Sequence, residues 1–263
     1  PAHREYDDRK NTANNAMMAL LAGAQLSSHF LQLTEGSDQL LPSIFPNVDH
    51  IKRFNLKTDA ATEILKAADT HLGMMAVPYV LSLHEDYLKT CASMLVAESL
   101  CSKTAARVNL VGLHDTIAEV CGGTFTSDLI SYINTLRLMR NSVIHAGAQA
   151  SQELINELAT WTPPLVSGWL GLAHRDPTTL AVGDVLELGH GEMSVALMVT
   201  KRLDREANVM LQGALPRSAW IRMVLDEADE ASPGITRRAD RGKAFRKARG
   251  IANFYYKPLA LTD

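Results

Sequence analysis

Hydrophobic residues recur every three to four positions along most of the chain, the spacing that places them on one face of an α-helix. The pattern predicts helices over residues 3–33, 59–71, 79–101, 105–120, 126–145, 151–172, 193–211 and 216–231. Residues 16–33 of the first helix are crowded with Met, Ala and Leu, so we expect this part to be buried. The pattern therefore predicts a mainly α fold.

Glycine and proline residues indicate where these helices end and begin. Gly73 follows the second predicted helix, and glycine is the residue that most often closes a helix. Pro78 is expected to open the third helix, because proline fits the first helical turn. Pro163 and Pro164 interrupt the helix over 151–172, so we expect it to form two pieces.

The only β signal lies at residues 179–188, with the sequence TLAVGDVLEL. Two short apolar runs flank Gly183 and Asp184, which is the arrangement of a β-hairpin. The resulting expectation is a mainly α helical bundle with a small β-hairpin insertion near 179–188.

Composition limits the classes of protein that the chain can belong to. Its 263 residues are 46% hydrophobic, which is enough for a sizeable core. No apolar run approaches the ~20 residues of a membrane helix, and no signal peptide is recognisable, so no membrane association is expected. The three cysteines, Cys91, Cys101 and Cys121, have no C-x-x-C spacing and indicate reduced thiols in a cytoplasmic protein.

The composition changes at Ser232, which predicts two domains: a helical domain over 1–231 and a basic tail over 232–263. Eight basic residues against two acidic ones give the tail a net charge of +6, so a total of −3 leaves −9 on residues 1–231. The basic residues expected to contact RNA are Arg237, Arg238, Lys243, Arg246, Lys247 and Arg249. Such a tail can bind phosphates while its aromatic residues stack on bases. Alternatively, the aromatic residues pack on the acidic body and the charges are solvated.

The helix over 126–145 carries the most informative polar residues of the chain. At about 100° per residue, Asn134, Arg137, Asn141 and His145 fall in one sector and form a polar stripe. The opposite arc is apolar, except that Arg140 lies within it, between Leu136 and Ile144 in angle. Because a guanidinium stays charged, Arg140 must reach solvent or meet a partner.

Residues that could bind a metal ion do not form a convincing site. His84, Glu85 and Asp86 are adjacent on a predicted helix, so their side chains point about 100° apart. Nothing else nearby in the sequence completes a ligand set. We expect these three residues to be solvated, and neither a metal nor a cofactor is predicted.

The segment LRLMRNSVIHAG, with Arg140, Asn141 and His145, resembles the motif of the HEPN family (higher eukaryotes and prokaryotes nucleotide-binding domains). That motif is Arg, a polar residue that is often Asn, and His four to six positions after the Arg, late in a bundle helix. A looser likeness covers residues 10–230. Many HEPN proteins are metal-independent ribonucleases whose site forms between two copies, and others are inactive partners or scaffolds.

The resemblance implies a role for each residue of the stripe. His145 would transfer protons near neutral pH, Arg140 would hold the phosphate, and Asn141 would orient the imidazole or the substrate. Arg137 and Asn134 would contact the substrate. Cleavage needs both a base and an acid, so a homodimer through this helix is expected to supply the second histidine. Its interface would cover Arg140 and an apolar patch of Ile130 and Leu138.

The sequence leaves three functions open. The first is an endoribonuclease of HEPN type, acting as a toxin or in phage defence. The second is an inactive helical interaction module that partners a nucleotidyltransferase, another effector or an antitoxin. The third, weaker alternative is a nucleic-acid binding protein that acts through its basic tail alone.

Overall fold

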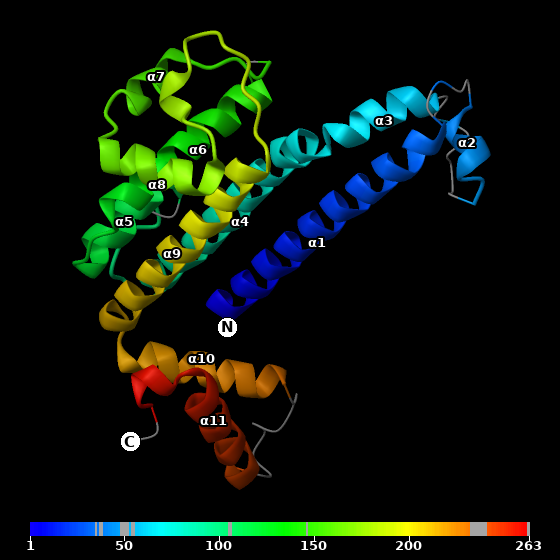
Figure 1. Cartoon of the computed structure of the whole chain (residues 1–263). Coiled ribbons are helices and arrows are strands. Elements are labelled where there is room, and N and C mark those ends of the chain that lie inside the picture. The colour runs from blue at the N-terminus through cyan, green and yellow to red at the C-terminus, as the bar shows by residue number, and fades with distance from the viewer. Residues whose placement is uncertain are drawn as a thin grey trace. The chain divides into compact units, whose positions relative to one another are not determined.

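The computed structural model describes residues 1–34, 36, 39–47, 53, 56–104, 107–145, 147–231 and 241–261. Over these residues the protein consists of α-helices and short 3-10 helices, without a strand (Figure 1). The prediction of a mainly α fold is therefore confirmed. None of the helices in these ranges is both long enough and apolar enough to cross a membrane.

The chain forms two compact units. The first unit contains residues 1–7, 84–126 and 202–263, and the second contains 8–83 and 127–201. Three helices contribute to both: α1 (Ala2–Leu31), α4 (Ala68–Ala97) and α9 (His190–Ala214). The predicted boundary between 231 and 232 adjoins residues 232–240, outside the described part of the chain, so it stays a prediction.

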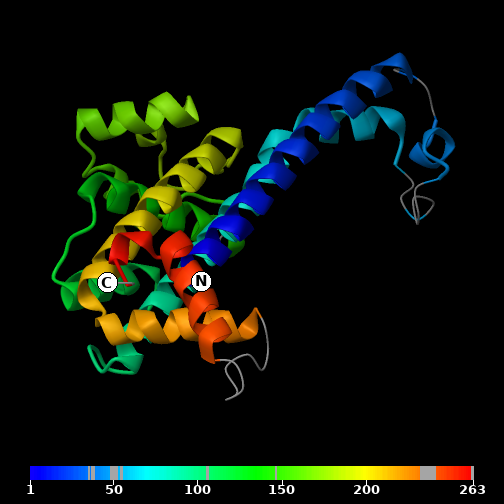
Figure 2. The same cartoon turned by 90° about the horizontal axis from the view of Figure 1, so that it is seen from below.

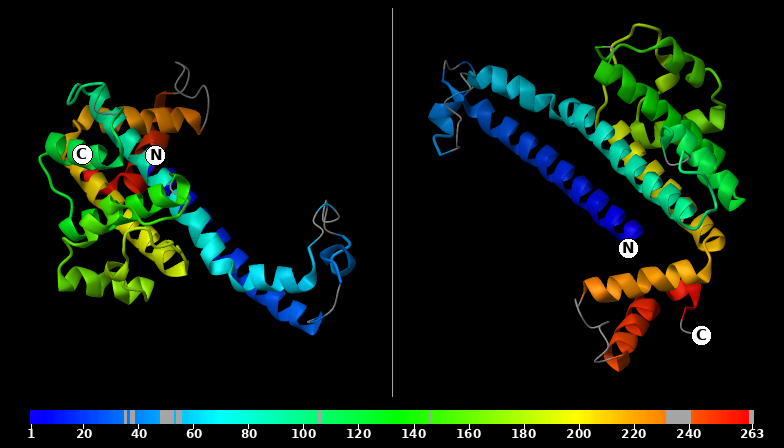
Figure 3. Two further views of the ribbon diagram at one scale, coloured as in Figure 1. Left: turned by 90° about the horizontal axis from the view of Figure 1, so that it is seen from above. Right: turned by 180° about the vertical axis from the view of Figure 1, so that it is seen from behind.

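In the second unit, α1 lies beside α3 (Thr58–Lys66) and the first half of α4, and the short helix α2 (Leu41–Ile44) precedes α3 (Figures 1 and 3). The expected break at Gly73 and Pro78 is wrong, since α4 continues through both residues. A Cβ atom at Gly73 would overlap the backbone of Leu188 and Gly189. Gly73 therefore permits a close backbone approach and does not end the helix.

The core of the second unit lies among α6 (Ser127–His145), α7 (Gln152–Leu158) and α8 (Pro163–Ala173). Tyr132 of α6 meets the rings of Trp161 and Trp169 edge-on, at centroid distances of 5.4 and 5.7 Å. Its hydroxyl donates a hydrogen bond of 2.7 Å to the carbonyl of Leu165. The aromatic cluster thus holds α6 against α8, as expected from the area that such rings bury.

The β-hairpin expected near 179–188 does not form. Its first run begins in a 3-10 helix, η4 (Pro177–Thr179), and its second run pairs with the chain that leaves α6. The N–H of Ala150 donates to the carbonyl of Asp184 at 2.8 Å, and the N–H of Leu186 donates to the carbonyl of Ala148 at 2.7 Å. The second run therefore satisfies its backbone groups on residues 148–150.

In the first unit, α5 (Leu110–Cys121) is capped at its start by Asn109, whose side chain accepts a hydrogen bond from the N–H of Gly112. Gly122, with a φ of 64°, caps its end. Near the other end of the chain, α11 (Arg241–Tyr255) crosses α10 (Arg217–Glu230), as Figure 2 shows. A helix at 241–255 was not expected from the sequence.

The solvated cluster expected at residues 84–86 is only partly correct. Asp86 is exposed, and Glu85 pairs with Lys89 one helical turn later at 2.7 Å. His84, however, is fully buried, and its Nε2 lies 3.1 Å from Nε2 of His114. Within the described residues, no group of three or more His, Cys, Asp or Glu could hold a metal ion.

The hydrogen bonds of this buried pair fix its protons. His114 Nδ1 lies 2.9 Å from the carbonyl oxygen of Leu110, which can only accept, so Nδ1 carries the proton. In the neutral ring, Nε2 of His114 then accepts from Nε2 of His84. Nδ1 of His84 is left as an acceptor, 3.4 Å from the hydroxyl of Tyr6. Burial lowers the pKa of His114 to about 4.

This lowered pKa predicts a loss of stability in acid. Between pH 6.5 and about 4 the unfolded chain protonates His114 and the folded chain does not. The free energy of unfolding should therefore fall by up to about 1.4 kcal/mol per pH unit through His114 as the pH drops across this window. Urea unfolding at several pH values measures the slope, and His114→Asn should make it shallower. An equal slope in that variant would contradict the assignment.

Candidate functional site

All five predicted site residues outside the tail lie on α6, where four are half-buried and only His145 is exposed. Its buried residues include five of the expected apolar arc: Leu129, Tyr132, Ile133, Leu136 and Met139. On the polar stripe, Asn134, Arg137 and Asn141 are half-buried and His145 is exposed. The amphipathic pattern of α6 thus directs the stripe toward the surface.

Arg140 is half-buried at the edge of the packed face of α6. Its Nη1 lies 3.4 Å from Oδ1 of Asn141, a long and weak hydrogen bond. Its Nε is buried and has no hydrogen-bond partner among the described residues. A buried donor without a partner costs about 1–3 kcal/mol, and more for a charged group. The guanidinium therefore has an unused capacity to bind an acceptor.

His145 is the last residue of α6, and the backbone that follows it is sharply turned. Gly147 and Ala148 have φ values of 61° and 63°, and the N–H of Ala148 donates to the carbonyl of Ser142 at 3.0 Å. A positive φ is uncommon for a residue with a Cβ. The pairing of residues 148–150 with 183–186 fixes this turn, so the chain cannot continue the helix past the histidine.

Arg137 lies near an acidic residue of the neighbouring helix α7. Burial raises the pKa of Glu157, and the positive charge of Arg137 opposes that rise. Nε of Arg137 is also buried without a hydrogen-bond partner in the described part of the chain. Arg137 thus serves at least partly as a counter-charge to Glu157, in addition to any contact with a substrate.

Arg140 and Asn141 lie together in the structure. The polar stripe contains a single imidazole, that of His145, whereas the expected cleavage needs both a base and an acid. The apolar patch of Ile130 and Leu138, which the dimer interface was expected to cover together with Arg140, is smaller than predicted. Leu138 is only 5% exposed, because it packs inside its own chain, and Ile130 is half-buried. An interface on this face of α6 would therefore consist mainly of the polar stripe.

The predicted RNA-binding residues of the tail divide into two groups. Arg237 and Arg238 lie outside the described residues. The other four lie on α11, where Lys243, Arg246 and Arg249 are exposed and Lys247 is half-buried.

The structure bears on the second expectation for the tail, that its aromatic residues pack on the body, whereas RNA binding stays a prediction. Tyr256 packs on the body, where it is buried and its hydroxyl donates to Glu227 at 3.0 Å. Arg4 also pairs with Glu227 and places its guanidinium 3.7 Å from the ring centre of Tyr255. Phe245 and Phe254 remain exposed beside the basic residues of α11.

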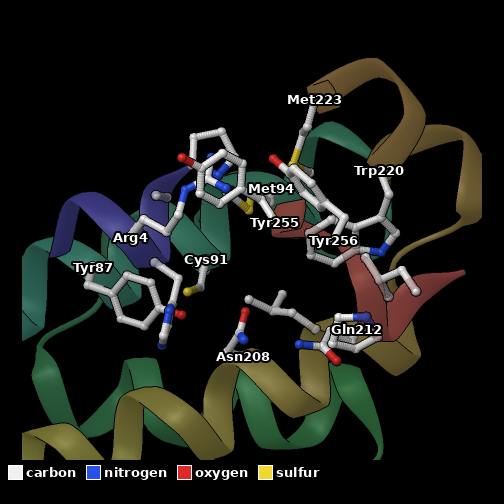
Figure 4. A pocket seen from close by; sticks show the side chains of 16 residues that line it. Arg4, Tyr87, Cys91, Met94, Asn208, Gln212, Trp220, Met223, Tyr255 and Tyr256 are labelled. Carbon is white, nitrogen blue, oxygen red and sulfur yellow. The ribbon is translucent and has the colours of Figure 1, made fainter. Parts of the chain in front are cut away.

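The first unit contains a cavity of about 170 Å³ that was not predicted from the sequence (Figure 4). Its polar and aromatic lining includes Arg4, Tyr87, Cys91, Asn208, Gln212 and Trp220. Nε1 of Trp220 is buried without a hydrogen-bond partner in the described residues. Spacings of four residues place Tyr87 with Cys91, and Asn208 with Gln212, on one helix face each. Nothing in the sequence predicts that these faces meet.

Comparisons of the chain with models of protein families, with curated proteins and with solved structures give no match. The function must therefore be argued from the geometry of the chain itself and from the motif on α6.

Proposed function

We propose that the protein is a metal-independent endoribonuclease of HEPN type, acting in stress response or phage defence. The observation that carries the proposal is the partial burial of Arg140 and its incomplete hydrogen bonding. This guanidinium is half-buried, has a donor without a partner, and lies against Asn141, one helical turn before the exposed imidazole of His145. A phosphate would supply a counter-charge for the half-buried guanidinium.

RNA supplies its own nucleophile for such a reaction. The ribose 2′-oxygen attacks the adjacent phosphorus and gives up its proton to a base, while the bond to the 5′-oxygen breaks and an acid protonates that oxygen. The products end in a 2′,3′-cyclic phosphate and a 5′-hydroxyl. His145 has the ordinary chemistry for either proton transfer. Arg140 would stabilise the charge that develops on the phosphoryl oxygens.

A second copy of the chain would complete the site. A base and an acid are two tasks, and a twofold arrangement of α6 helices would place two His145 side chains at one cleft. Asn134 and Arg137, on the same stripe, would then contact the RNA on either side of the cut.

An inactive helical interaction module is the second candidate function. It is favoured by the hydrogen bonding of Arg140, which among the described residues is to Asn141 and not to His145. It is also favoured by the large apolar surface that α1 exposes. This alternative predicts a stable complex with another effector and no cleavage of RNA.

The nature of the nucleophile tests the proposed chemistry. RNA should be cut, whereas the same sequence with every ribose 2′-O-methylated should stay intact, because its 2′-oxygen has no proton to lose. Equal cleavage of both substrates would exclude attack by the 2′-oxygen.

The exposed cations of α11 predict a salt-dependent affinity for RNA. Each phosphate contact releases about 0.7 counterion from a single strand, so the logarithm of the binding constant should fall linearly with the logarithm of salt concentration. Arg246→Gln should reduce that slope by about one contact, whereas Asn253→Gln, on the same helix, should leave it unchanged. Filter binding at several salt concentrations measures both. A salt-independent affinity would assign α11 a purely structural role.

A further inference from the structure

Helix α1 has apolar residues on two opposite faces, and its own chain covers only one of them. At 100° per residue, Ala13, Met17, Ser28 and Leu31 lie on one side of the helix, and all four are buried. This face packs within the second unit. Only some of the apolar residues in 16–33 lie on this buried face. The expectation that the whole segment is buried was therefore too broad.

The opposite face carries an apolar stripe of Met18, Ala22, Leu26, Phe30 and Leu33. Met18, Leu26 and Phe30 follow one another at intervals of four or eight residues and are 45%, 72% and 51% exposed. Leu33, just past the helix, is exposed as well. The centre of this stripe is about 170° from the centre of the buried face, so the segments that bury one face do not reach the other. Within the described residues, Phe30 at the end of the stripe also meets the ring of Phe45 at a centroid distance of 6.5 Å.

The sequence of α1 is unusual for a helix face in contact with water. From Asn11 to Thr34 it contains no Asp, Glu, Lys or Arg. A helix face left to solvent normally carries charged residues, and a helix that is apolar on opposite sides is normally enclosed. Gln25 and Gln32 flank the apolar stripe, and the exposed His29 lies within its sector. The stripe therefore has the composition of a surface that another helix covers.

We infer that the stripe Met18–Leu33 of α1 is an interface for a second copy of this chain, with the two α1 helices packed antiparallel around a twofold axis. A stripe without Asp, Glu, Lys or Arg meets its own copy with little electrostatic repulsion, whichever end of the helix it faces, and His29 is its one titratable residue. Such a twofold contact repeats the same patch on both partners.

The size of the stripe suits this partner. Its 16 residues span about 24 Å of helix, so pairing two stripes and their flanks removes on the order of 10³ Å² from water, near the lower end of stable interfaces. Other partners fit less well. Nucleic acid requires cations that this stretch lacks, and a helix that lies on a membrane surface usually carries Lys or Arg on its polar face.

This interface is separate from the proposed contact between α6 helices. It goes beyond the proposed function, because the α1 stripe would pair two copies whether or not the protein cleaves RNA. The polar stripe of α6 offers little apolar area of its own, so α1 is the stronger source of affinity between copies.

Sedimentation velocity of the full chain tests the inference. The natural chain should be a dimer at micromolar concentration. Leu26→Glu should raise the dimer dissociation constant by about 10²-fold or more, because it places two carboxylates in the interface between the two stripes. Leu20→Glu adds the same charge at an exposed position of the same helix, about 120° from Leu26 and outside the stripe and its flanks, and should remain dimeric. Circular dichroism should show equal helicity for the two variants, since both positions are exposed.

Each other outcome overturns the inference. A monomeric natural chain, an undiminished dimer in Leu26→Glu, or an equal loss in both variants would each do so. Ile130→Glu on α6 distinguishes this failure from that of the proposed function: loss of the dimer in this variant alone would place the contact on α6. RNA cleavage is measured separately and does not enter this test.

Discussion

Changing His145 to alanine is expected to slow RNA cleavage by at least ~10²–10⁴-fold, the range typical of a positioned acid–base group. Arg140→Ala should have an effect of similar size, because the transition state loses its cation. Single-turnover cleavage of a labelled RNA measures both. Arg140→Lys should also fail, because an ammonium keeps the charge but loses the planar fork of donors. Asn141→Ala should be milder, since the proton carrier stays in place.

The control for this series is His71→Ala, which removes an exposed histidine from α4 in the same compact unit. It should leave cleavage unchanged. His84→Ala does not serve this purpose, because His84 is buried beside His114 and its loss would disturb the first unit. A His145→Ala variant that folds and cuts RNA as fast as the natural chain would leave the interaction module as the better interpretation.

Replacing Trp169 by alanine should destabilise the protein by about 3–5 kcal/mol, the cost of removing a large buried aromatic side chain. Trp169 is fully buried and contacts Tyr132 and Trp161 in the cluster that holds α6. The adjacent Leu170 is partly exposed, so Leu170→Ala should cost much less. Urea unfolding of the three proteins measures the difference. Equal losses for Trp169→Ala and Leu170→Ala would show that the cluster does not hold the core together.

The helices could be predicted because local pattern and tertiary environment agree in most of them. In α6 most of the apolar arc is buried, although Ile144 is exposed, and the polar stripe is half-buried to exposed. α8 begins at Pro163, and α7 follows Ser151, whose side chain caps it by accepting from Leu154. These signals act within one helical turn, so a reading of the sequence alone can find them.

The errors concern residues whose role depends on a distant segment. Gly73 predicts a helix end locally, but its missing side chain admits the backbone at residues 188–189. Residues 179–188 have the composition of a hairpin, yet the second half pairs with the chain after α6. His84 has acidic neighbours in sequence and a buried histidine, His114, as its neighbour in space. Local propensity does not determine such contacts.

The candidate site shows the same division. Its residues share one helix, so their common face follows from helical geometry alone. The buried donor of Arg140, without a partner among the described residues, results from the packing around α6. The helical periodicity showed only that a charged residue falls within an apolar arc. The exposed stripe of α1 shows the limit most clearly: an apolar residue predicts burial, but not whether its own chain or a second copy provides the cover.

Cleavage of RNA in excess EDTA, measured side by side for the natural chain and His145→Ala, tests the proposed ribonuclease site most directly. We predict that the natural chain cuts and leaves 2′,3′-cyclic phosphate ends, and that the variant, equally folded by circular dichroism, does not. Cleavage by neither protein, or by both at the same rate, would contradict a ribonuclease site at His145.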